Sequence, residues 1–104
     1  MVVRHNLEEK AVFKMKDKVG WSSQSGGYFT KKIGRIVGVI PPNCSPEQAI
    51  RVEAARYNAS TAYGGGRRRK EESYLVLVES TGRNGKPRKP VLYWPLTQKL
   101  HKVM

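Results

Sequence analysis

A run of three glycines followed by four cations, residues 64–70 (GGGRRRK), is the part of this chain best suited to binding phosphate groups. Glycine leaves the backbone free to adopt many conformations, so we expect a mobile loop that presents concentrated positive charge. Two more basic clusters, Lys31-Lys32 with Arg35 and the stretch 83–89, offer the same chemistry. The alternative is a solvated loop that only aids solubility. The expected nucleic-acid-binding residues are Lys31, Lys32, Arg35, Arg67, Arg68, Arg69, Lys70, Arg83, Lys86, Arg88 and Lys89, with Tyr63 placed to stack on a base.

The aromatic residues suggest a different kind of binding site. Trp21, Tyr28 and Phe29 could line a cage for a methylated cation, with Asp17 as the nearby carboxylate. The net charge of +12 would repel a cationic ligand at long range, so we disfavour this alternative. We expect most of the rings, including Trp21 and Trp94, to lie in the core, because a small domain needs large side chains to fill it.

No arrangement of residues in the sequence points to catalysis or to a metal. His5 and His101 lie near opposite ends of the chain, and the one cysteine, Cys44, has no histidine beside it. Two histidines and one cysteine do not supply a recognisable set of metal ligands. We therefore expect a non-enzymatic protein with no cofactor and no metal.

The composition limits the class of protein. A chain of 104 residues with 20 Lys+Arg against 8 Asp+Glu is expected to form one domain and to meet a polyanion, most often nucleic acid. A lone cysteine excludes an internal disulfide and fits a reducing cytosol. No apolar stretch is long enough for a secretory signal or a membrane span, so we expect a cytoplasmic protein without a membrane partner. Residues 1–10 are expected to be disordered and residues 11–104 to form the domain.

Several short strands must position the cations. The stretch 32–40 (KIGRIVGVI) reads as a strand with a bend or bulge at its glycines, and 73–79 (SYLVLVE) reads as a central strand. Asn84-Gly85 predicts a hairpin turn to a return strand at 89–94. The stretch 22–27 reads as a loop, and residues 98–103 are expected to end the chain as a 3₁₀ turn or a short edge strand.

One helix interrupts these strands. Ser45 is a good N-cap, Pro46 suits the first helical position, and Gln48 stands where a capping box needs it, so we predict a helix over about 46–58. Residues 59–72 read as a loop, which makes 41–72 a large insertion. We expect the helix to cap an open end of the barrel, the alternative being a docking surface that uses Arg51 and Arg56. The pattern as a whole predicts a mainly β fold, a small bent barrel of four to five strands with one inserted helix.

Three stretches, 14–23 (KMKDKVGWSS), 34–40 (GRIVGVI) and 92–103 (LYWPLTQKLHKV), resemble SH3-like barrels of the Tudor and KOW type. In outline they are similar to bacterial Tudor-like domains of the hypervirulence-associated type. The resemblance covers about half of the chain, and Lys16 stands where these domains have the glycine of a Gly-Asp turn. It implies an SH3-like barrel, and members commonly bind nucleic acid, ribosomal components or peptides. Small barrels host many functions, so the resemblance supports the fold more than any activity.

The sequence thus predicts a small non-enzymatic nucleic-acid-binding protein that holds phosphates of DNA or RNA through the Gly-Arg loop and the basic hairpin. An alternative is a protein-interaction module or accessory subunit that docks an acidic protein or a nucleoprotein complex, with the basic loop providing steering. A third hypothesis, a small phage or mobile-element protein that inhibits a host nucleoprotein machine, fits the size of the chain.

The loop hypothesis makes one prediction from sequence alone. Replacing Arg67, Arg68 and Arg69 by Ala should weaken nucleic-acid binding and flatten its salt dependence without lowering stability, because mobile cations contact phosphates rather than the core. Binding measured across a salt series checks this, and an unchanged salt slope would remove the loop from the interface.

Overall fold

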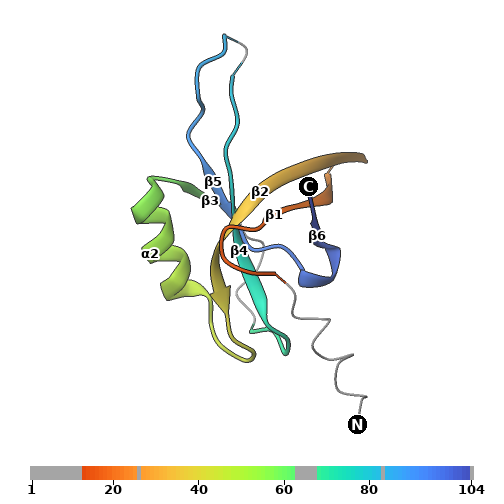
Figure 1. Cartoon of the computed structure of the whole chain (residues 1–104), viewed down its shortest axis with the longest axis vertical. Coiled ribbons are helices and arrows are strands. Elements are labelled where there is room, and N and C mark those ends of the chain that lie inside the picture. The colour runs from red at the N-terminus through yellow and green to blue at the C-terminus, as the bar shows by residue number, and fades with distance from the viewer. Residues whose placement is uncertain (1–12, 26, 63–67, 83, 104) are drawn as a thin grey trace.

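A computed structural model of the chain describes residues 13–25, 27–62, 68–82 and 84–103 (Figure 1). Its six strands form one mixed sheet in the order β3-β5-β4-β2-β1-β6, in which the β3–β5 pair is parallel. Over the described residues the edge strands β3 and β6 do not pair with each other, so the sheet is open. The predicted mainly β fold with one helix is confirmed at this level, but the sheet has six strands rather than the predicted four to five. The elements are β1 (Lys18–Ser25), β2 (Tyr28–Ile40), α2 (Glu47–Tyr57), β3 (Ser60–Ala62), β4 (Ser73–Val78), β5 (Val91–Tyr93), the 3₁₀ turn η1 (Thr97–Lys99) and β6 (His101–Lys102).

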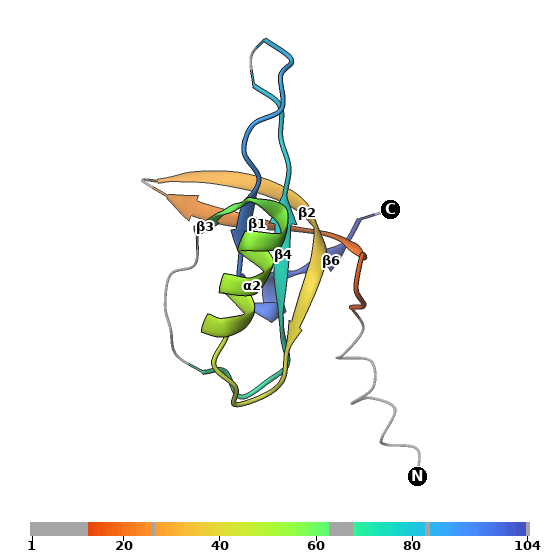
Figure 2. The ribbon, with the colours of Figure 1, turned by 90° about the vertical axis from the view of Figure 1, so that its left-hand side faces the viewer.

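Strand β4 is the central element of the core because it is buried on both faces. Tyr74 and Val76 belong to one cluster of buried side chains, and Leu75 and Leu77 belong to the other. Helix α2 lies against one face of the sheet (Figure 2), where Ile50 packs into the second cluster. The prediction of a central strand from the continuous apolar run is therefore confirmed. The first cluster also contains Val19, Trp21, Ile36 and Leu100, and the second also contains Val37, Ile40, Leu92 and Trp94.

Strand β2 bends so that it can pair with two different neighbours. Its first half pairs with β1 and its second half pairs with β4, and the register shifts between Ile36 and Gly38. Val37 and Ile40, three residues apart, both belong to the second cluster, which strict alternation would not allow, so the bulge shifts the side-chain pattern by one residue. The bend predicted at the glycines is confirmed. The sheet curls as a result, and Trp21 of β1 meets Tyr93 of β5 edge to face, with 5.5 Å between ring centroids.

Helix α2 begins one residue later than predicted and lacks the expected capping box. Pro46 is the N-cap and makes no side-chain cap hydrogen bond, while Ser45 Oγ accepts a hydrogen bond of 3.4 Å from the Glu47 amide. At the other end Asn58 adopts a left-handed φ of 51° and its amide donates to the carbonyls of Ala54 and Ala55. Asparagine tolerates this conformation, so it ends the helix cleanly.

The structure also decides three predictions about segments expected to be loops or to end the chain. The expected loop at 22–27 is mostly strand, because β1 continues to Ser25. The expected loop at 59–72 contains β3, so the predicted insertion 41–72 holds a strand as well as the helix. The end of the chain forms both a 3₁₀ turn and a short edge strand, as predicted. The prediction for residues 1–10 lies outside the described residues.

Gly34 of β2 lies very close to the backbone of the neighbouring strand β4, and this predicts that Gly34→Ala destabilises the fold. A Cβ at position 34 would overlap the Leu77 carbonyl oxygen and come within 2.8 Å of Val76 Cγ1, so the strands would have to move apart. We expect a loss of roughly 1–3 kcal/mol in the free energy of unfolding, measured by urea denaturation. Gly82→Ala is the control, because a Cβ there meets its nearest atom at an ordinary 3.5 Å. Equal stability of the two variants would contradict the account of the bend.

Candidate nucleic-acid interface

A two-stranded projection, which we call the finger (residues 79–90), extends β4 and β5 away from the rest of the sheet (Figures 1 and 2). Its strands are held by hydrogen bonds from the Arg88 amide to the Ser80 carbonyl, 2.9 Å, and from the Gly82 amide to the Lys86 carbonyl, 2.7 Å. Gly85 has a φ of +79°, which glycine adopts at little cost. The hairpin predicted from Asn84-Gly85 is confirmed, with a connection longer than two residues.

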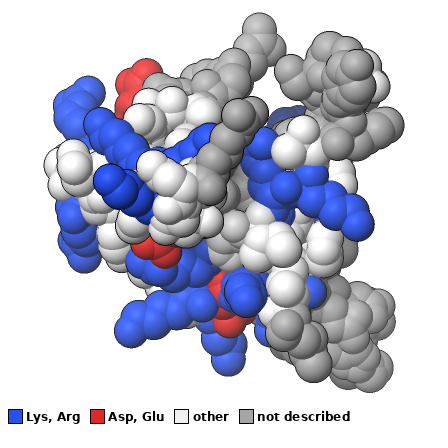
Figure 3. All heavy atoms as spheres, turned by 90° about the horizontal axis from the view of Figure 1, so that it is seen from above, with Lys and Arg blue, Asp and Glu red and all other residues white. Residues whose placement is uncertain are grey.

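The finger is basic along its length. Residues 80–90 contain four cations and no carboxylate. Lys86, Arg88 and Lys89 are exposed, while Arg83 lies outside the described residues. Seen from above, at the end that carries the finger, Lys and Arg side chains are far more numerous than acidic ones (Figure 3). The finger therefore presents positive charge that no neighbouring acidic residue of the same segment neutralises.

The second predicted cluster is divided between the two faces of β2. Lys18 pairs with Arg35 and Ser22 pairs with Lys31, so Lys31 and Arg35 share the face of the β1–β2 hairpin that we call the outer face. Lys32 points the other way, and its Nζ lies 5.4 Å from the centroid of the Tyr93 ring. Only Lys31 and Arg35 of this cluster can therefore act together on one surface.

Arg35 joins the outer face to the foot of the finger. Its Nη1 lies 2.6 Å from Oε1 of Glu79, the first residue of the finger, and its guanidinium carbon lies 5.6 Å from the centroid of the Tyr57 ring. Both members of the ion pair are substantially exposed, so the pair positions Arg35 more than it stabilises the fold. The finger and the outer face thus meet at one corner.

The described end of the Gly-Arg run, residues 68–70, does not lie at this corner. Arg68 and Lys70 are exposed and precede β4, whereas the finger follows it, so the two segments are separated by roughly 20 Å, the length of six extended residues. Tyr63, Arg67 and the glycines 64–66 lie outside the described residues. Residues 68–70 and the finger therefore lie at opposite ends of β4.

Arg69 has an internal role that sequence reasoning missed. Its Nη1 and Nη2 donate hydrogen bonds to the carbonyls of Pro95, 2.6 Å, and Trp94, 2.8 Å. Its guanidinium carbon also lies 3.6 Å from the centroid of the Trp94 ring. Burial lowers the pKa of Arg69, an effect that nearby Glu71 opposes. Two of its five donors are thus used within the protein, so Arg69 is less available to phosphate than the exposed Arg68 and Lys70. The expectation that replacing Arg67, Arg68 and Arg69 by Ala leaves stability unchanged is corrected for Arg69, because that change removes these internal contacts.

Sequence reasoning also missed Lys16 and Lys18. With Arg35 they line an open hollow of about 450 Å³ at the foot of the finger, together with Ile33, Leu77 and Glu79. A signal was present in the sequence, because Lys14, Lys16 and Lys18 recur at every second residue. The pairing register of β1 with β2, which no local pattern in the sequence gives, was needed to place Lys18 opposite Arg35.

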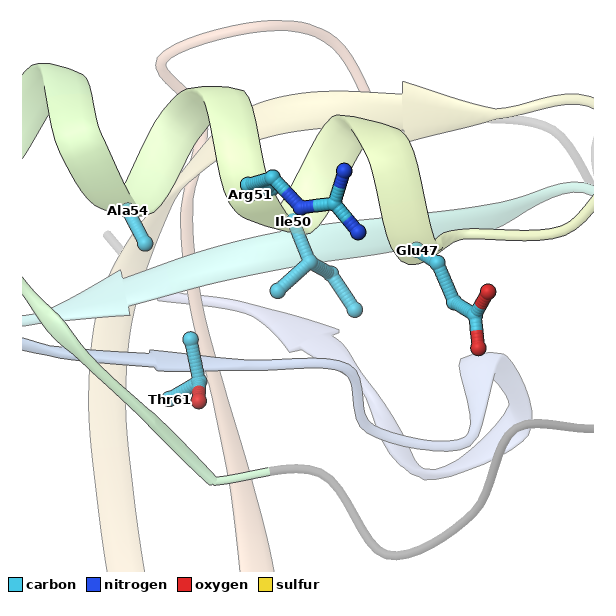
Figure 4. Close-up of a pocket in the computed structure, with 5 residues that line it drawn as sticks. All are labelled: Glu47, Ile50, Arg51, Ala54 and Thr61. Atoms are coloured by element: carbon cyan, nitrogen blue, oxygen red, sulfur yellow. The ribbon is translucent and has the colours of Figure 1, made fainter.

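A second hollow of about 380 Å³ lies between α2 and β3 (Figure 4). Ile50 and Ala54 of the helix point toward the sheet, and Thr61 of β3 lies opposite them. Glu47 and Arg51 add one charge of each sign, so this hollow does not attract a polyanion. It is the place where a protein segment could contact the helix.

The remaining candidates are an aromatic cage and a metal site. Trp21 is 5% exposed, so it belongs to the core as expected; the side chains of Tyr28 and Phe29 are not described. Among the described residues, no three His, Cys, Asp or Glu side chains are grouped so that they could hold a metal ion. In the same part of the chain, no helix is both long and apolar enough to cross a membrane.

Comparison with protein-family models, with curated proteins and with solved structures finds no match to this chain. The assignment of a function therefore rests on the arrangement of its own residues.

The internal contacts of Arg69 predict that Arg69→Lys destabilises the protein although the charge is kept. A lysine ammonium group cannot donate to the Pro95 and Trp94 carbonyls with the geometry of a planar guanidinium, and it cannot stack flat on the Trp94 ring. We expect a loss of about 1–3 kcal/mol in the free energy of unfolding, measured by chemical denaturation, with the salt slope of nucleic-acid binding unchanged. Arg68→Lys, at an exposed neighbour, should have no effect on stability. If both variants are as stable as the wild type, the internal role of Arg69 is wrong.

Proposed function

We propose that this protein is a small non-enzymatic nucleic-acid-binding protein that holds phosphates with the finger and the outer face of the β1–β2 hairpin. The observation that carries the proposal is the finger itself, a hydrogen-bonded projection with four cations and no carboxylate over residues 80–90. Extending such a segment from the sheet exposes charge on several sides. A strand of phosphates is the partner that this arrangement suits best.

The distribution of ion pairs supports the same proposal. The described residues form three salt bridges, Arg35–Glu79, Arg56–Glu53 and Lys102–Asp17, and none involves Lys86, Arg88 or Lys89. The acidic partners in these bridges are Glu79, Glu53 and Asp17, so the exposed cations Lys86, Arg88 and Lys89 keep their charge available for a partner. Arg68 and Lys70, with Arg67 and Tyr63 beyond the described residues, form a second basic site in this proposal, at the other end of β4.

The finer fold assignment belongs to this proposal as well. A partly open SH3-like barrel of the Tudor and KOW type is supported by the run of neighbours β6-β1-β2-β4-β5 and by η1, which directly precedes the last strand. The contact between Trp21 and Tyr93 across the curled sheet supports it further. A cytoplasmic location is part of the proposal too and is supported by the free, exposed Cys44, which suits a reducing compartment.

A second candidate function is docking of an acidic protein partner, for which α2 offers a surface. The hollow beside β3 and the exposed Val52, Arg51 and Arg56 favour this candidate. The other large exposed apolar side chains are Ile33 and Val39 of β2 and Met15 and Leu96 of connecting segments, so none of them belongs to α2. This scatter gives the protein partner less support than the finger gives to nucleic acid.

The finger hypothesis predicts that replacing Lys86, Arg88 and Lys89 together by Ala weakens nucleic-acid binding by about tenfold or more at roughly 0.1 M salt. The slope of log affinity against log salt should fall by about two to three, because that many phosphate contacts are lost. Fluorescence anisotropy with single- and double-stranded DNA and RNA measures both quantities and identifies the preferred form.

The matched control removes three exposed cations elsewhere, Arg51, Arg56 and Lys99, and so makes the same change in net charge. It should reduce affinity far less than the finger variant does. Equal losses in the two triple variants would show that total charge, not the finger, determines binding. Weak binding of the wild type to all four nucleic acids near physiological salt would contradict the proposal and favour the acidic protein partner.

A further inference from the structure

Lys16 adopts a backbone conformation that lysine normally avoids. Its φ is +75°, and it occupies the third position of a turn closed by a 3.0 Å hydrogen bond from the Asp17 amide to the Lys14 carbonyl. Glycine is favoured at this position of such turns because a side chain is crowded there. Over the described residues the other non-glycine positions with positive φ are Asn43 and Asn58, and asparagine tolerates this region.

The surrounding structure imposes this conformation but does not require a lysine side chain. The Lys16 amide donates a 2.7 Å hydrogen bond to the Ile36 carbonyl, and the Ile36 amide donates a 2.9 Å bond to the Asp17 carbonyl. These bonds use only the backbone, so glycine would serve the fold at least as well. An unfavourable residue at a fixed turn is a reason to ask what its side chain does.

The Lys16 side chain lines the hollow at the foot of the finger with two other cations. Lys18 and Arg35 stand directly opposite each other in the β1–β2 register, an arrangement in which like charges repel. Glu79 is the acidic residue of the hollow, and it is bound to Arg35. Asp17 does not line the hollow; its Oδ2 accepts the Lys14 amide at 2.9 Å and lies 3.7 Å from Lys102 Nζ.

Three cations and one carboxylate therefore line a concave surface. The protein keeps two unfavourable features there, the positive φ of Lys16 and the like-charged pair of Lys18 and Arg35. A bound anion would relieve the repulsion between Lys18 and Arg35 and would give the Lys16 side chain a partner. The hollow opens beside the finger, so a chain of phosphates lying along the finger would bring one of its groups to this point.

We propose that the hollow formed by Lys16, Lys18 and Arg35 binds a phosphate group, supplied by the backbone of the nucleic acid that the finger holds. Lys16 and Lys18 contact the phosphate, and Glu79 with Tyr57 orients the Arg35 guanidinium beside it. The inference rests on the proposed function only for the source of the phosphate, since the anion site itself follows from the residues of the hollow.

The decisive variant is Lys16→Gly, which separates binding from folding. The glycine suits a φ of +75°, so we expect the melting temperature to stay the same or rise. Nucleic-acid affinity should fall about three- to tenfold at low salt, and the salt slope should fall by about one, as for the loss of one phosphate contact. Lys18→Gln should weaken binding similarly. Glu79→Gln should strengthen it, because the amide oxygen can still accept the hydrogen bond that orients Arg35 while the negative charge of the hollow is removed.

Two controls isolate the site. Lys99→Ala removes one exposed cation from η1 and should change affinity by less than twofold. Asn58→Gly places glycine at another positive φ without a change of charge and should leave binding unaltered. If Lys16→Gly weakens binding no more than Lys99→Ala does, the phosphate site is wrong while the finger proposal stands.

A titration with inorganic pyrophosphate tests the site without any nucleic acid. Amide chemical shifts of ¹⁵N-labelled wild-type protein should change at Lys16, Lys18 and the 33–35 segment, and these changes should disappear in Lys16→Gly. If they appear although the protein binds no nucleic acid, the anion site stands and the proposed function falls. If pyrophosphate moves none of these amides, the site is overturned, whatever the nucleic-acid result.

Discussion

Strand β2 must bend sharply enough to pair with β1 along one half and with β4 along the other, and the rest of the structure depends on that bend. Gly34 permits it, because the strand passes so close to the Leu77 backbone that a side chain would not fit. The bulge between Ile36 and Gly38 then shifts the alternation by one residue, so that Val37 and Ile40 pack in one cluster while Ile36 packs in the other, on the opposite face of β4. One strand can therefore support two hydrophobic layers in a short chain.

The bend also determines where the charge lies. It turns the β1–β2 hairpin away from the line of β4 and β5, so the hairpin and the finger leave the core in different directions (Figure 1). The two meet where Arg35 binds Glu79. A chain with a net charge of +12 must keep its cations apart or solvated to remain folded. The β1–β2 hairpin and the finger separate the cations and expose them to solvent. The same arrangement leaves a concave, basic corner between them, which is the geometry that a phosphate chain would need.

Local patterns in the sequence predicted much of the fold. The apolar run at β4, the Asn84-Gly85 turn, the helix start at Pro46 and the short final strand each depend on neighbouring residues alone. Strand β3 could not be predicted in this way, since it is stabilised by parallel pairing with β5, some thirty residues further along the chain. Its three residues are all exposed, so they lack the alternation that marks a half-buried strand.

The candidate site was predicted less completely than the fold, because the sequence shows which residues are charged but not which residues they contact in space. Arg69 resembles the other cations of its run, yet it binds two backbone carbonyls and stacks on Trp94. Lys18 became a candidate only when the strand register placed it opposite Arg35. Lys86, Arg88 and Lys89 are exposed, as expected for a hairpin whose residues 80–90 contain no carboxylate, and their role in binding stays a prediction.

The most direct test of the account is to map where a nucleic acid touches the protein, by following the amide chemical shifts of ¹⁵N-labelled protein during titration with the oligonucleotide that binds tightest. We predict saturable changes over the finger, residues 79–90, and over the outer face of β1–β2, with α2 unaffected except at Tyr57, which contacts Arg35. Changes concentrated on α2 and β3, or no saturable change at all, would contradict the claim that the finger and the outer face form the interface.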